Sequence, residues 1–190
     1  MNLSEEEKHE LLELARSTIT SKCSDQSHQF NIPNSDSLNE KRGTFVSLYK
    51  KQGELAGCIG FIDSPDPLYQ TVIQAAEAAA FRDPRFEGIR REDLSDLKIE
   101  ISALTPLELI HEPTDLKIGV HGIFLKKGDY HGLLLPQVAV RYKWNAETFL
   151  DQTCTKAGLE TGSWKEPDAE IYRFSAEVFS EEESQPPENN

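Results

Sequence analysis

The sequence predicts an α+β fold built from two units, at about residues 43–105 and 118–179, that each run hairpin, helix, strand. Two observations predict this order: paired β-rich runs that flank turn residues, and a helical pattern followed by a strand with period-two alternation. Neither unit alone buries much of a sheet face. We therefore expect the strands to join in a single curved, barrel-like, mainly antiparallel sheet with the helices outside.

An amphipathic helix is expected before the first unit, at about residues 4–22. Ser4 and Glu7 form a capping-box pattern there, ahead of apolar residues at helical spacing. The polar stretch 24–42 is rich in Asn and Ser and contains a proline, so we expect a surface connection without regular structure.

The first unit opens with β-rich runs at 43–49 and 55–62, which predict a hairpin. Asp66-Pro67 is typical of a helix start, and small apolar residues then recur at helical spacing to about Phe81. The alternation at 99–103 predicts a half-buried strand.

The second unit opens with a hairpin around the turn 127–129. The register that this turn sets pairs Leu125 with His131 and Leu135 with His121. The two histidines are then about 13 Å apart at roughly 3.3 Å per residue, too far to share one ion. We expect no metal site, although His121 can act singly as an acid, a base or a hydrogen-bond donor.

A helix at 145–157 and a strand at 170–179 complete the second unit. The agreement in element order favours an internal duplication. Glycines correspond in two pairs, Gly43 with Gly122 and Gly57 with Gly132.

Composition excludes several classes of protein. Of 190 residues, 37% are hydrophobic and 28% charged, and no apolar run approaches the roughly 20 residues of a membrane-spanning helix. The net charge is 20 − 33 = −13. The densest basic stretch, 82–93, balances four arginines with four carboxylates, which disfavours nucleic acid.

We expect one domain over residues 1–180 and a disordered acidic tail at 181–190. The acidic N-terminus lacks the pattern of a secretory signal, so a cytoplasmic protein is expected. The three cysteines, an odd number without a CxxC motif, are expected to be thiols.

Cys58 is the first candidate for chemistry, because it lies between Gly57 and Gly60 in a strand, where glycine marks a close approach of backbone or ligand. Cys58 is either a thiolate nucleophile or a small buried apolar residue, and no histidine is adjacent in sequence to activate it. Both interpretations stay open.

Two further segments carry polar candidates. In the turn Asp83-Pro84-Arg85-Phe86, the carboxylate of Asp83 can accept backbone hydrogen bonds and Arg85 is presented near a helix end. Gln137 follows a strand, where its amide can either bind a ligand or tie down the exit loop. The common nucleotide-binding and hydrolase motifs, GxGxxG, GxxxxGK[ST], HExxH and GxSxG, do not occur.

Seven separated motifs resemble the AMMECR family, also called AmmeMemoRadiSam system protein A, over roughly residues 5–180. They are LAGCIGFI, AAFRDPRF, LKIEISALTPLELI, IGVHGIFL, GLLLPQVA, FLDQTCTKAGL and Trp164. Ala56 stands where the family has a basic residue beside the cysteine. The resemblance implies an α+β fold with a duplicated unit and a barrel-like sheet, and it supplies no established reaction.

The resemblance also implies partners, a Memo-like protein and a radical S-adenosylmethionine enzyme. This chain lacks the CxxxCxxC motif for an iron–sulfur cluster, so radical chemistry would belong to the partner. Two functions remain: an accessory or substrate-presenting protein, or a cysteine-dependent enzyme acting through Cys58 on a small carbonyl- or carboxylate-containing substrate. The cofactor and the oligomeric state stay open.

The family motifs place one candidate site where three segments converge. Its expected catalytic residue is Cys58, and its expected ligand-binding residues are Gly57, Gly60, Asp83, Arg85 and Gln137. A carbonyl or carboxylate held by Arg85 and Gln137 would face the thiol.

Overall fold

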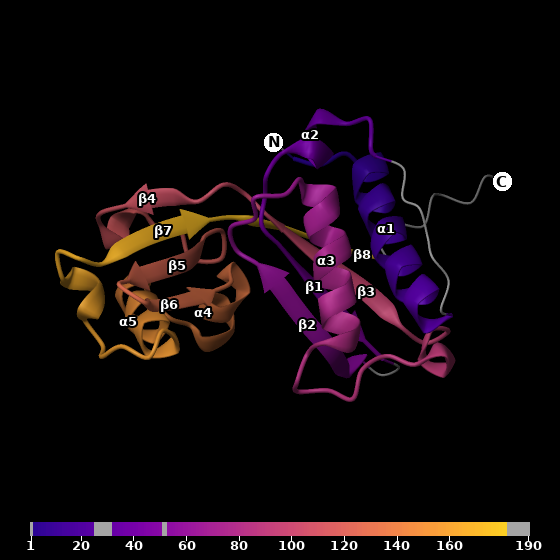
Figure 1. Cartoon of the computed structure of the whole chain (residues 1–190). Helices are drawn as coiled ribbons and strands as arrows, with labels where there is room; N and C mark the ends of the chain where they lie inside the picture. The colour runs from indigo at the N-terminus through magenta and orange to yellow at the C-terminus, as the bar shows by residue number, and fades with distance from the viewer. Residues whose placement is uncertain (1, 25–31, 51–52, 182–190) are drawn as a thin grey trace. The chain divides into compact units, whose positions relative to one another are not determined.

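The computed structural model describes residues 2–24, 32–50 and 53–181, and the chain divides into two units (Figure 1). The first unit combines residues 1–104 with 177–190, and the second is the continuous stretch 105–176. Most of the predicted tail, residues 182–190, lies outside the described residues. Glu181 is described, and its carboxylate pairs with Arg16.

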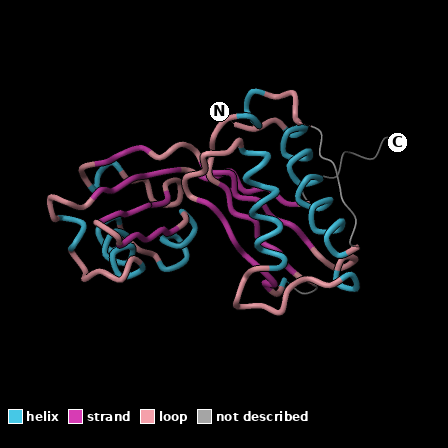
Figure 2. Tube along the Cα trace, in the orientation of Figure 1, coloured by secondary structure: helices cyan, strands magenta, loops and turns pink. Residues whose placement is uncertain are grey.

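The first unit is a four-stranded sheet, in the order β2-β1-β3-β8, with α1 and α3 packed against it (Figures 1 and 2). Its helices and strands are α1 (Glu5–Cys23), α2 (Asp36–Asn39), β1 (Thr44–Tyr49), β2 (Leu55–Phe61), α3 (Leu68–Phe81), β3 (Lys98–Leu104) and β8 (Ala176–Ser180).

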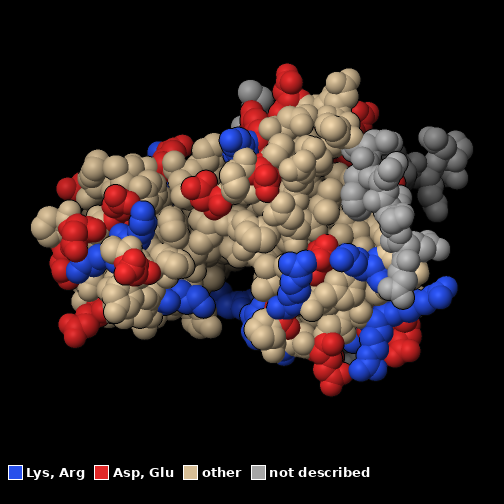
Figure 3. Space-filling model, in the orientation of Figure 1, with Lys and Arg blue, Asp and Glu red and all other residues tan. Residues whose placement is uncertain are grey.

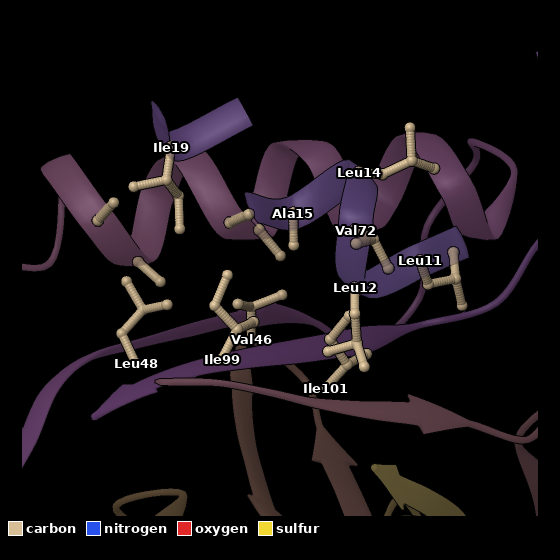
Figure 4. Packing of buried hydrophobic residues seen from close by; sticks show 14 of the residues in the cluster. Leu11, Leu12, Leu14, Ala15, Ile19, Val46, Leu48, Val72, Ile99 and Ile101 are labelled. Atoms are coloured by element: carbon tan, nitrogen blue, oxygen red, sulfur yellow. The ribbon is translucent and has the colours of Figure 1, made fainter. Parts of the chain in front are cut away.

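The core of the first unit lies between this sheet and its two helices (Figure 4). Val46 and Leu48 of β1 and Ile99 and Ile101 of β3 are fully buried, at alternate positions along each strand. Residues of α1 and α3 cover them, among them Leu11, Leu12, Ala15, Ile19 and Val72. Each large side chain buried in this way stabilises the fold by about 1.5–3 kcal/mol.

The second unit is a separate four-stranded sheet in the order β4-β7-β5-β6. Its helices and strands are β4 (Glu108–Ile110), β5 (Gly122–Lys127), β6 (Tyr130–Leu134), α4 (Pro136–Tyr142), α5 (Ala146–Lys156) and β7 (Glu170–Phe174). Ile123 and Leu125 of β5 are buried against Phe149 and Leu150 of α5, and these residues form a second core.

The mixed α+β class and the antiparallel pairing are confirmed, but the strands form two sheets where one was expected. Each sheet has helices of its own and gains a fourth strand, β8 or β4, so each buries a face by itself. The strand expected at 170–179 is in fact two strands, β7 and β8, in different sheets.

Three local expectations were wrong. The stretch 24–42 contains α2, which the hydroxyl of Ser35 caps and whose Leu38 is fully buried. The segment after Leu134 is the helix α4, with a proline in its first turn, and was expected to be a loop. The second hairpin pairs Leu125 with Gly132 because its turn has two residues, so the expected register was shifted by one.

Candidate functional site

Cys58 lies on β2, an edge strand of the first sheet, and its side chain is on the face away from α3. Its neighbour Gly57 fixes this orientation. A Cβ atom added at Gly57 would lie 2.1 Å from the carbonyl oxygen of Ala79 in α3. Gly57 is therefore needed for the close approach of the helix, and the next side chain, that of Cys58, points to the opposite face.

Gly60 lies on the same face as Cys58 and makes room for an aromatic ring. A Cβ atom at Gly60 would lie 2.3 Å from Cδ1 of Phe45, the residue paired with it on β1. The ring of Phe45 therefore covers Gly60 and borders the surface that carries the thiol.

Asp83 and Arg85 hold both backbone groups of Cys58. The N–H of Cys58 donates to Oδ2 of Asp83 at 2.9 Å, and Nη2 of Arg85 donates to the carbonyl oxygen of Cys58 at 2.9 Å. On an edge strand these groups have no neighbouring strand to bind. The two side chains supply the hydrogen bonds that a fifth strand would supply, and we call this arrangement the Asp83–Arg85 brace.

The brace is a charged pair with one buried end. Arg85 donates to the Asp83 carboxylate from Nε at 2.9 Å and from Nη2 at 2.7 Å. The Arg85 guanidinium and the backbone bonds hold the pKa of Asp83 far below its usual range, while Asp83 raises the pKa of Arg85. The side chain of Asp83 is 1% exposed and that of Arg85 is 57% exposed, so the guanidinium can meet a ligand from solvent.

The thiol of Cys58 accepts a hydrogen bond from the hydroxyl of Ser47 at 3.3 Å. Ser47 stands opposite Cys58 on β1 and opposite Glu100 on β3, so the three side chains form a row across the sheet. The backbone of Cys58 bonds outward to the brace, as expected for a non-hydrogen-bonded pair, in which side chains lie close together.

Tyr49 is next to this row, and its hydroxyl donates to Oε1 of Glu100 at 3.3 Å. Burial raises the pKa of Tyr49, and the Glu100 carboxylate raises it further, so the phenol stays protonated at neutral pH. The half-buried face of the first sheet therefore offers a thiol, two hydroxyl groups and a carboxylate.

A catalytic thiol needs a base, and the described part of the first unit offers it no imidazole. His9, the histidine described there, lies on α1 beside Glu13. The described residues also contain no group of three or more His, Cys, Asp or Glu side chains that could hold a metal ion, and no helix among them is long and apolar enough to cross a membrane.

Two predicted polar residues belong to the second unit. Gln137 is exposed on the first turn of α4. Its participation in a site with Cys58 stays a prediction. His121 accepts a hydrogen bond at Nδ1 from the backbone N–H of Lys117, and partial burial lowers its pKa.

Sequence reasoning brought Cys58, Asp83 and Arg85 into one hypothesis, and the structure brings them into contact. It missed Ser47, Glu100 and Tyr49. The signal for Ser47 was available, because counting residues back from the first hairpin turn places it near Cys58. No local pattern placed Glu100 there, since β3 follows a helix.

The comparisons with known proteins agree on one family. A family profile described as AMMECR1 matches residues 12–179. Protein TK0174 of Thermococcus kodakarensis is 47% identical over 154 residues, which are 76% of this chain and 75% of the relative. A protein of Methanothermobacter thermautotrophicus is 40% identical over 188 residues, 95% of this chain and 97% of its own length.

A solved structure agrees in fold as well. The crystal structure of the uncharacterised protein PH0010 from Pyrococcus horikoshii matches with a TM-score of 0.80 at 40% sequence identity, covering 90% of each chain. Profile, sequence and fold agree over most of the molecule, and on this evidence the chain belongs to the AMMECR1 family.

Proposed function

We propose that this protein binds a small carboxylate- or carbonyl-containing molecule against Cys58 and presents it to partner proteins. The Asp83–Arg85 brace is the observation that carries the proposal. It fixes the backbone of Cys58 at both polar groups and leaves the thiol on the half-buried face of the sheet. Side chains held by such bonds bind a ligand with little loss of conformational entropy.

The guanidinium of Arg85 supplies the charge for such a ligand. Its Nη2 is bonded to Asp83 and Cys58, but more than half of the side chain is exposed, which leaves N–H groups for a carboxylate. Gly57 serves the packing of α3, and Gly60 makes room for Phe45 beside the ligand.

Presentation is favoured over catalysis because no imidazole, the usual base of a catalytic thiol, lies beside Cys58 among the described residues of its unit. The proposed partners are a Memo-like protein and a radical S-adenosylmethionine enzyme, and the family resemblance of the seven motifs supports them. The proposal keeps the predicted cytoplasmic location.

One observation favours the second function, a cysteine-dependent enzyme. The Cys58 sulfur receives the Ser47 hydrogen bond, and the Arg85 guanidinium contacts the same residue. A donor and a cation are the groups that stabilise a thiolate. In that case the sulfur would add to the carbonyl carbon of the substrate: the C–S bond would form as the C=O π bond opens, and the proton of the thiol would end on the former carbonyl oxygen.

Native mass spectrometry of the protein after incubation with a metabolite extract distinguishes the two functions. If the protein presents a ligand, we expect a non-covalent adduct that Arg85→Gln removes. Arg82→Gln is the matched control, because Arg82 is an exposed arginine at the end of α3 that pairs with Glu77. A covalent adduct that Cys58→Ser abolishes would favour the enzyme, and an adduct that survives Arg85→Gln would contradict the site.

We also propose that the two units arose by duplication. Both sheets place the second hairpin strand at an edge, then the first, then the strand after the helices, then a further strand. Gly57 and Gly132 support the proposal, since both stand opposite a buried leucine of the hairpin and both meet helix backbone.

A further inference from the structure

Four exposed apolar side chains lie on and beside α4 in the second unit. Ile118 is 38% exposed, Val120 52%, Val140 56% and Tyr142 60%. A Cβ atom added at Gly119 would lie 3.1 Å from Cγ2 of Val140, so the loop that carries Ile118 and Val120 contacts α4. We call these four side chains the α4 patch. Contiguous apolar surface of this kind marks interaction sites more often than scattered residues do.

The aromatic member of the patch is held in place. The ring of Tyr142 stacks on Trp144 at a centroid distance of 4.9 Å and an interplanar angle of 17°. Trp144 in turn packs beside Phe149 of the second core. A tyrosine fixed in this way presents apolar area and a hydroxyl group at a small entropic cost on binding.

Three cations border the α4 patch: Lys117, Arg141 and Lys143. All three are exposed, and the described part of the chain gives none of them an ion-pair partner. Other cations of the same unit are paired, Lys127 with Glu166 and Arg173 with Glu108. The protein as a whole carries a net charge of −13, so an unpaired basic border stands out against its surroundings. Figure 3 shows basic atoms over the region of α4 in the same orientation as Figure 1.

Lys143 occupies a position that favours glycine. It follows α4 in the left-handed region with φ 55°. Among the described residues, Lys143 is the only one other than glycine with a positive φ. Its N–H and that of Trp144 close the helix by bonding to Val140 and Ala139. A lysine here is strained relative to glycine, and strain of this kind is typical of sites where the side chain is used.

We infer that the α4 patch docks an acidic segment of a partner protein, which inserts an aromatic or aliphatic side chain among the apolar residues. The three cations would pair with carboxylates around that anchor. A membrane fits less well, because three cations are fewer than lipid-binding clusters carry and the net charge of −13 is repelled by anionic lipid. The inference does not depend on the Cys58 site.

The test uses the full chain and a fluorescent random copolymer of glutamate and tyrosine as the probe, with polyglutamate as the probe without an anchor. We expect the copolymer to bind more tightly than polyglutamate. Val140→Glu and Lys143→Glu should each weaken its binding about tenfold or more. Leu109→Glu and Lys156→Glu are the matched controls, an exposed leucine and an exposed lysine of the same unit, and should change it less than twofold.

Lys143→Gly separates binding from folding. Removing the strain should raise the melting temperature by about 2–4 °C, while loss of the cation weakens copolymer binding. An unchanged alkylation rate of Cys58 in each variant shows that the first unit is intact. Equal losses in the controls, absence of copolymer binding, preferential binding to phosphatidylserine vesicles, or self-association through the patch would each overturn the inference.

Discussion

The two units share a strand order, and in each of them a glycine of the hairpin lies against a helix. They differ in the row of side chains next to that glycine. Gly57 stands opposite Leu48, and Gly132 stands opposite Leu125, in the two hairpins. One residue further on, the first unit has the row Cys58, Ser47, Glu100, whereas the second has Leu133, Phe124, Tyr172.

This difference separates architecture from chemistry. The glycine contact with a helix occurs in both units, so it belongs to the fold. The row of thiol, hydroxyl and carboxylate occurs in the first unit, and its counterpart in the second is a packed aromatic pair, Phe124 and Tyr172, with centroids 6.1 Å apart. Function in the first unit is therefore best sought on the Cys58 row and in the brace behind it.

Substituting the glycine that lies against a helix in each unit should reduce the stability of the protein most. Gly57→Ala and Gly132→Ala should each destabilise the protein by about 3 kcal/mol or more, because the new Cβ would lie 2.1 Å or 2.7 Å from a helix carbonyl oxygen. Chemical denaturation measures the loss. Gly128→Ala is the control: it has open space and positive φ, so about 1 kcal/mol is expected. If Gly57→Ala leaves the stability unchanged, the close approach of α3 to β2 does not require a glycine there.

Asp83→Asn tests the Asp83–Arg85 brace of the first unit. We expect a loss of about 2–3 kcal/mol, because the buried site loses its charge-assisted bonds with Arg85 and Cys58. Asp66→Asn, which removes an exposed carboxylate bonded to Gln74, should change the free energy of unfolding by less than about 0.5 kcal/mol.

The same variant gives a pH prediction. Asp83 has a folded-state pKa depressed below its unfolded value near 3.9, so its contribution is complete above about pH 5 and is lost as the pH falls through the acid range. The wild-type protein should therefore lose more stability than Asp83→Asn between pH 5 and pH 2. Parallel stability curves would show that the carboxylate is not held as described.

Ser47→Ala tests whether the Ser47 hydroxyl increases the reactivity of the Cys58 thiol. Removing the hydroxyl should slow alkylation of Cys58 about three- to tenfold at neutral pH, since the thiolate loses a donor. Cys23 is the internal control in the same digest. Burial, and then Asp93, raise the pKa of Cys23, so it should react slowly in both proteins. An unchanged rate at Cys58 would remove Ser47 from the site.

The smallest effect is expected from Leu133→Cys, which puts a thiol at the corresponding place in the second unit. Its partner across the hairpin is Phe124, which offers sulfur no hydrogen-bond donor. We expect alkylation at least about threefold slower than at Cys58, and a stability loss of about 1–2 kcal/mol. Equal rates would show that the neighbouring side chains of the row do not increase the reactivity of Cys58.

Sequence reasoning succeeded where one segment determines the outcome. Ser4 with Glu7 indicated the first helix, whose capping box is present, and alternation indicated β3. Sequence reasoning failed where contacts between distant segments determine which sheet a strand joins. The alternating run 170–179 has one pattern but belongs to two sheets, because pairing partners and not periodicity separate β7 from β8.

The candidate site follows the same rule. Cys58 and the Asp83–Arg85 turn were identifiable as separate segments. Their contact depends on α3 carrying the turn back to the edge of β2, which no spacing rule encodes. Ser35 and Leu38 were overlooked for a different reason: the capped turn of α2 is too short for periodicity to reveal.

The placement of β8 has a consequence for biosynthesis. Residues 105–176 form the second unit as one continuous stretch, so every residue of that unit is synthesised before the last strand of the first unit. The first unit must wait, because its fourth strand and the buried ring of Phe179 arrive after every residue of the second has been made. During translation the nascent first sheet therefore has an open edge at β3, and chaperones that recognise unpaired strands would act on it in that interval.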